Sequence, residues 1–172
     1  MKQLTFNVSD DNLYELLEKF RNYFFTDPKE KDYMHWLEKR TDFIRNTFFN
    51  LKELKVKDQN EIQELIKEYI KNYLEGRRKV YPEKTIKKLS KKFPEIIEYL
   101  TKSNDNISDK INNLMEKSGK YRFEKVLTQF WYPIISSLNP EKYPGCNNKT
   151  YKALKELGIK FPTIITEGER YQ

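Results

Sequence analysis

The chain has 172 residues, of which 37% are hydrophobic and 34% charged, with a formal net charge of +7, one cysteine and one histidine. This length supports one domain with its own core, and a single cysteine excludes an intramolecular disulfide. Because the sequence contains no long apolar run and no basic-then-apolar leader, it predicts a cytoplasmic protein that is not inserted in a membrane.

The first part of the chain predicts one short strand followed by helices. Residues 4–8 alternate apolar and polar side chains, as a half-buried strand does, and Ser9 is placed to cap a helix that ends before Pro28. A second helix is expected over residues 28–51. A third, opened by a capping box, is expected over residues 58–76 because its apolar side chains recur with helical spacing.

The next segment, residues 77–92, carries as much positive charge as the whole chain. It holds one carboxylate, Glu83, and eight cationic residues: Arg77, Arg78, Lys79, Lys84, Lys87, Lys88, Lys91 and Lys92. In a helix starting after Pro82, four of these lysines fall on one stripe, and the apolar residues fall on another. Such a row of ammonium groups is typical of a surface that binds the phosphate backbone of nucleic acids, and a solvated helix face is the other interpretation.

Helices continue beyond the cationic segment. A short helix is expected over residues 94–102, because Pro94 begins it, and a polar loop over residues 103–106. Ser108 is placed to cap the next helix and Gly119 to end it. Residues 121–138 then predict a further helix.

The C-terminal tail is the second candidate for β structure. Residues 159–166 have strand propensity but contain a proline, so an edge strand is expected there. The pattern as a whole predicts a mainly α fold, an irregular bundle of six to eight helices with at most a marginal short β ribbon from the termini. We expect a single helical domain over residues 1–172.

The connection after residue 138 is rich in turn-forming residues. Pro140 disfavours the helical conformation at Asn139, and Pro144 continues the turn. Asn147 or Asn148 can cap the helix that follows. We therefore expect a rigid helical hairpin in which Asn139, Pro140, Pro144 and Asn147 have structural roles.

Three consecutive aromatic residues precede this turn. Phe130, Trp131 and Tyr132 fill nearly one helical turn, so their rings cannot all point the same way. A ring that points outward can stack on an unpaired or flipped base, which makes Trp131 and Tyr132 candidate base-stacking residues. Packing of these rings in the core is the alternative interpretation.

Residues 127–158 carry a motif: an apolar helix, then Leu-Asn-Pro-Glu-Lys-Tyr-Pro, an asparagine and Ala-Leu-Lys-Glu-Leu-Gly. This motif resembles a module of McrB-like proteins of modification-dependent restriction systems. In that family an N-terminal region recognises DNA, often with a modified base, and precedes an AAA+ GTPase motor that works with a nuclease. The chain has no Gly-x-x-x-x-Gly-Lys-Ser/Thr motif. The resemblance therefore implies an N-terminal specificity domain whose motor and nuclease lie elsewhere.

No residue set in the sequence predicts catalysis. His35 is the only histidine, which excludes a multi-histidine metal site, and the nuclease-like triplet at residues 53–55 is expected by chance in a chain this rich in Glu and Lys. We predict a DNA-binding domain, not an enzyme, without catalytic residues, metal or cofactor. Its predicted partner is double-stranded DNA, including modified DNA. The alternative is a helical adaptor whose basic face binds an acidic protein.

Overall fold

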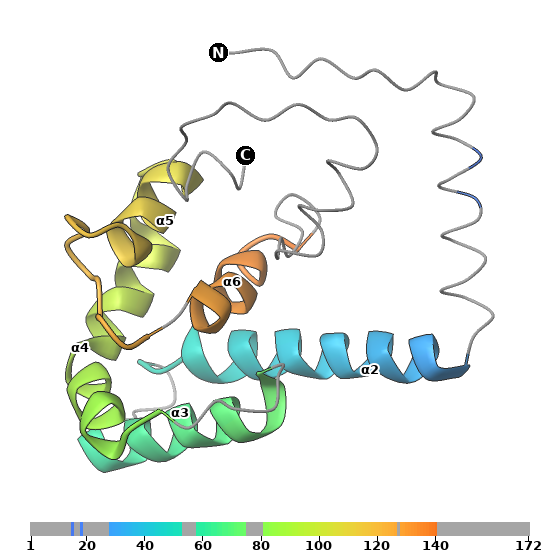
Figure 1. The fold of residues 1–172 in the computed structure, drawn as a ribbon, viewed down its shortest axis with the longest axis horizontal. Helices are drawn as coiled ribbons and strands as arrows, with labels where there is room; N and C mark the ends of the chain where they lie inside the picture. Colours follow the sequence, from blue (N-terminus) through green and yellow to red (C-terminus); the bar gives the residue numbers. More distant parts are fainter. Residues whose placement is uncertain are drawn as a thin grey trace. The chain divides into compact units, whose positions relative to one another are not determined.

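The structure is a computed structural model, and it describes Glu15, Glu18 and residues 28–52, 58–74, 81–126 and 128–140. The chain divides into two compact units, Met1–Lys39 with Cys146–Ile164 and Arg40–Gly145 with Ile165–Gln172. Most described residues belong to the second unit. Five α-helices and one π-helical segment occur in the described residues, which contain no strand (Figure 1). The predicted mainly α fold is thus confirmed for this part, and the single domain stays a prediction.

Several sequence predictions lie outside the described residues. They are the strand at residues 4–8, the Ser9 cap, the Gly76 helix end and the tail strand at residues 159–166. The expected ribbon and the full number of helices therefore stay predictions.

The helix predicted over residues 28–51 is present, but it changes from an α-helix to a π-helix before its end. Helix α2 spans Pro28–Phe43, and the π-helix η1 spans Ile44–Phe48. At its end the Phe49 N–H donates to the Ile44 carbonyl, five residues earlier, at 3.1 Å. This wider turn is the characteristic hydrogen bond of a π-helix. Ile44 and Phe48 are both fully buried, so the wider turn lies where the helix enters the core.

Helices α3, Gln59–Tyr73, and α4, Glu83–Lys102, pack against each other in opposite directions, because Gln59 contacts Ser90 while Lys67 contacts Glu83. The predicted start of α3 is confirmed. The Asp58 carboxylate accepts a hydrogen bond from the Asn60 N–H at 2.9 Å, which satisfies one of the unpaired donors at the helix start.

The prediction that a helix ends at Phe93 and a new one begins at Pro94 is wrong. Helix α4 continues through Pro94. Proline cannot donate the usual backbone hydrogen bond, which normally weakens a helix. Here Leu89 and Phe93 before the proline, and Ile96 and Leu100 after it, are buried in the same core. We attribute the continuity to this shared apolar face, whose packing compensates for the missing hydrogen bond.

Helix α5 spans Ile107–Met115, and its cap differs from the predicted one. The Asn106 side chain accepts a hydrogen bond from the Asp109 N–H at 2.9 Å, so Asn106 is the N-cap. Ser108 lies inside the first turn and is buried. Both residues are good caps by type, and Asn106 is the one with the extended backbone conformation of a cap.

Gly119 follows α5 in a close backbone approach. An added Cβ at this position would lie 2.5 Å from the carbonyl oxygens of both Asn112 and Asn113. We expect Gly119→Ala to lower the free energy of unfolding by about 1–3 kcal/mol, because backbone atoms must shift to make room. Chemical denaturation measures this loss. The exposed neighbour is the control, since Ser118→Ala should stay within about 0.5 kcal/mol of wild type. Equal stability of the two variants would contradict the prediction.

The helix predicted over residues 121–138 is shorter in the structure. Helix α6 spans Thr128–Ser136, and residues 121–126 before it form turns. The Tyr121 N–H donates to the Asn113 carbonyl at 2.9 Å, which ties the start of this segment to α5. Within α6, Phe130 and Ile134 are fully buried. The Tyr69 hydroxyl donates a hydrogen bond to the Phe130 carbonyl at 3.1 Å, and this bond connects α3 to α6. Burial raises the pKa of the Tyr69 hydroxyl.

Candidate nucleic-acid interface

The exposed face of the first half of α4 carries four lysines, which we call the lysine row: Lys84, Lys87, Lys88 and Lys91. All four are exposed. Ile86, Leu89 and Phe93 on the opposite face are buried in the core. Because the apolar face fixes how α4 is rotated about its axis, the ammonium groups point toward solvent.

The lysine row carries positive charge that neighbouring carboxylates do not neutralise. Among the described residues, no member of the row forms an ion pair with a carboxylate. Lys92 differs, because its Nζ lies 3.1 Å from Glu95 Oε2. The four row lysines are therefore the exposed cations of α4 that remain available to a ligand.

The second half of the exposed face of α4 is charge-balanced. Glu98 Oε1 lies 2.5 Å from Lys52 Nζ and 3.2 Å from Lys102 Nζ. The hydrogen bond from Lys52, together with the one from Lys102, lowers the pKa of Glu98 and keeps it ionised. The uncompensated charge consequently ends near Lys91.

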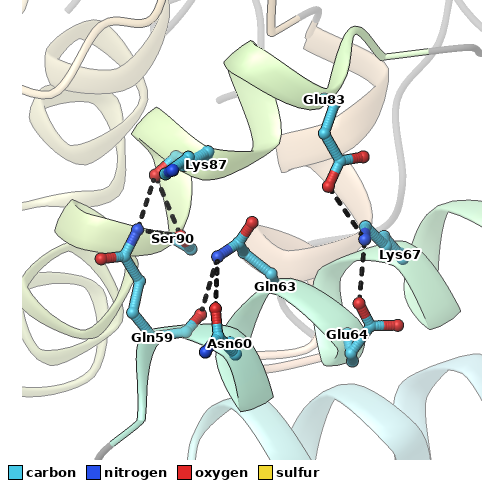
Figure 2. Close-up of polar contacts among 8 residues, drawn as sticks. All are labelled: Gln59, Asn60, Gln63, Glu64, Lys67, Glu83, Lys87 and Ser90. Carbon is cyan, nitrogen blue, oxygen red and sulfur yellow. Dashed lines mark hydrogen bonds and ion pairs between the residues drawn. The ribbon is translucent and has the colours of Figure 1, made fainter.

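Polar side chains of α3 hold the helical turn that carries Lys87, as Figure 2 shows. The Gln59 side-chain amide donates to the Lys87 carbonyl at 3.2 Å and to Ser90 Oγ at 3.3 Å. The Ser90 hydroxyl, which is buried, donates to the same carbonyl at 3.0 Å. Gln63 extends the network on α3 by donating to the Gln59 carbonyl at 3.4 Å. These bonds hold the turn of α4 at Lys87 and Ser90 against the start of α3.

A second link between the two helices is ionic. Lys67 Nζ lies 2.8 Å from Glu64 Oε1 and 3.0 Å from Glu83 Oε1 (Figure 2). Hydrogen bonds to Glu64 and then Glu83 raise the pKa of Lys67. Gln59, Lys67 and Ser90 were not predicted from the sequence to belong to this surface. A usable signal was present only for Ser90, which is a polar residue at a position on the apolar face of α4.

The remaining predicted site residues fall into two groups. Arg77, Arg78, Lys79, Pro144 and Asn147 lie outside the described residues, so their roles stay predictions. Asn139 and Pro140 are described and exposed, directly after the end of α6.

Trp131 was a candidate for base stacking, but the structure places its ring in the core. Its ring centroid is 4.9 Å from that of Phe130 and 6.3 Å from that of Phe93, and the side chain is 0% exposed. The indole Nε1 is buried and has no hydrogen-bond partner among the described residues. Stacking on a base would require Trp131 to leave this environment. Tyr132 is partly buried against the same core.

Elsewhere, a concave region with a volume of about 490 Å³ lies beside α5 and the following turn. Its lining is polar and includes Asp105, Asp109 and Glu116. The Tyr99 hydroxyl donates to Asp105 Oδ2 at 2.7 Å, and burial raises the pKa of Tyr99 to about 12.

Over the described ranges, no group of three or more His, Cys, Asp or Glu side chains is arranged to hold a metal ion. Nor does any helix in those ranges combine the length and apolar character needed to cross a membrane.

Comparisons with known proteins give no relative for this chain. No protein-family model matches it, and no curated protein or solved structure shows significant similarity to it. The resemblance of residues 127–158 to McrB-like proteins therefore stays an expectation from the motif alone.

Proposed function

We propose that this chain is a helical DNA-binding domain that contacts the phosphate backbone of a duplex through the lysine row of α4. The observation that carries the proposal is the row itself: exposed ammonium groups on one face, without carboxylate partners among the described residues. A helix whose opposite face is buried presents these groups in a fixed arrangement. Neutralising phosphates releases condensed counterions, which favours binding without dependence on sequence.

The shape of the row favours a duplex as the ligand. Lys84 and Lys91 are separated by about 10 Å along the helix axis, since each residue adds about 1.5 Å. That length matches several phosphates of a DNA duplex. Recognition of single strands relies on exposed rings beside the cations. Trp131, one of the two rings that the sequence offered as candidates, is buried.

The biological setting that we propose comes from the motif in residues 127–158. Its resemblance to McrB-like restriction proteins supports a specificity domain that reads duplex DNA, including modified DNA. An AAA+ motor and a nuclease subunit would be its functional partners. The chain described here would contribute binding, and its lysine row would position the duplex without selecting a sequence.

Salt dependence tests the proposed backbone contact. If the four lysines of the row each meet a phosphate, the logarithm of the affinity for a short mixed-sequence duplex should fall with the logarithm of salt with a slope of about −3.6. Fluorescence anisotropy at several salt concentrations measures this slope. Replacing the four lysines with glutamine should bring it close to zero. A folded wild-type protein that binds no duplex at low salt would contradict the proposal.

The same titration separates DNA specificity from an adaptor function. A modified duplex that binds more tightly than its unmodified counterpart, by a factor that salt does not change, would support base recognition. A helical adaptor with an acidic protein partner predicts only weak binding to either duplex.

A further inference from the structure

Glu83 is the only carboxylate among residues 77–92, and it lies four residues before Lys87. A glutamate four residues N-terminal to a lysine is the arrangement that favours an ion pair on a helix surface. In the structure Glu83 does not pair with Lys87. Its carboxylate instead contacts Lys67 of the neighbouring helix at 3.0 Å (Figure 2). Lys67 and Lys87 are thus alternative partners for one carboxylate.

The geometry around Lys67 explains why it is the preferred partner. Its side chain is 36% exposed, compared with 68% for Glu83, so Lys67 is the less solvent-exposed member of this pair. Glu64, one turn earlier on α3, holds the same ammonium group at 2.8 Å. Pairing Lys67 with Glu83 therefore requires ordering of little more than the glutamate side chain. A pair between Glu83 and the exposed Lys87 would require ordering of two mobile side chains.

We propose that Lys67 is a positioning residue for the DNA-binding surface, because by pairing with Glu83 it leaves the Lys87 ammonium group available to phosphate. This inference rests on the proposed function. Lys67 need not touch DNA in this role, since it acts through Glu83. The Glu83 carboxylate, the one at this end of the row within the described part of α4, is then paired with Lys67 and not with a member of the row.

A matched pair of variants tests the inference. Lys67→Met and Lys71→Met remove the same charge from α3, and Lys71 is exposed one turn further along. Lys67→Met should weaken binding to a mixed-sequence duplex at low salt about two-fold more than Lys71→Met does, the size expected of one i,i+4 ion pair. Lys67→Arg should bind like wild type, because it restores the pair with Glu83.

The Glu83→Gln background removes the carboxylate for which the lysines compete. There Lys67→Met and Lys71→Met should weaken binding equally. A difference between them that persists in this background would mean that Lys67 acts by its own proximity to DNA, and would overturn the inference. Equal effects of the two variants in the wild-type background would overturn it as well.

A measurement without DNA separates this inference from the proposed function. In wild type, the ¹³C resonance of the Glu83 carboxyl should not respond to Lys87→Met, because Glu83 pairs with Lys67. In Lys67→Met, the same resonance should shift when Lys87→Met is added. The same response in both backgrounds would overturn the inference. Failure of wild type to bind any duplex would overturn the proposed function, and the resonance would still decide whether Lys67 controls the pairing of Glu83.

Discussion

Replacing Lys84, Lys87, Lys88 and Lys91 together with glutamate is expected to abolish binding to duplex DNA and to leave the fold intact. The four side chains are exposed, and the apolar residues that fix α4 in the core lie on its opposite face. Reversing the charge of these four side chains therefore changes the surface potential without removing core contacts. Loss of four phosphate contacts, together with added repulsion, should reduce the affinity at low salt by more than about a thousand-fold. Anisotropy titration and circular dichroism measure binding and helix content.

The control for this variant must carry the same net charge. Lys71, Lys117, Lys120 and Lys125 are four exposed lysines outside the row, and their replacement with glutamate changes the net charge equally. If location matters, this control should retain clearly measurable binding. Equal loss in both variants would show that total charge, rather than the row, determines binding. Unchanged affinity of a folded row variant would remove α4 from the interface.

The sequence predicted which helices form better than it predicted where each helix ends, because helix ends depend on contacts between distant residues. The apolar spacing correctly indicated α3 and the buried face of α4, and Asp58 was correctly identified as a cap. Pro94 favoured a helix boundary, because proline has no backbone N–H to donate and its ring clashes with the preceding turn. The boundary is absent because apolar residues on both sides of Pro94 pack in one core. Similarly, nothing local in residues 44–48 distinguishes a π-helix from a continued α-helix.

In the candidate site, too, features set within one helix were predicted, and features set by contacts between helices were not. Charge spacing located the lysine row and predicted its separation from the apolar face, since both follow from one helical period. The pairing of Glu83 with Lys67 was not predictable, because it requires α3 and α4 to be placed side by side. Within α4 alone, the preferred partner of Glu83 would have been Lys87. The position of Trp131 was open for a related reason, since helical spacing does not say which ring of three faces the core.

Truncation of Trp131 has the largest expected effect on stability. Its side chain is fully buried between rings that include Phe93 and Phe130, which links α6 to α4. Trp131→Ala should lower the free energy of unfolding by about 3–5 kcal/mol, because it removes these contacts and leaves a cavity. Denaturation followed by circular dichroism measures the change. A loss this large is a substantial fraction of the stability of a typical domain.

Trp131→Phe separates a core role from a base-stacking role. Phenylalanine keeps an apolar ring and removes the buried indole N–H, for which the described part of the chain provides no hydrogen-bond partner. Because an unpaired buried donor costs about 1–3 kcal/mol, its removal should offset part of the lost packing, and Trp131→Phe should be much closer to wild type than Trp131→Ala. DNA affinity of folded Trp131→Phe should equal that of wild type, since the lysine row is unchanged. A stable Trp131→Ala variant that discriminates less between modified and unmodified duplexes would instead mean that the ring leaves the core to stack on a base.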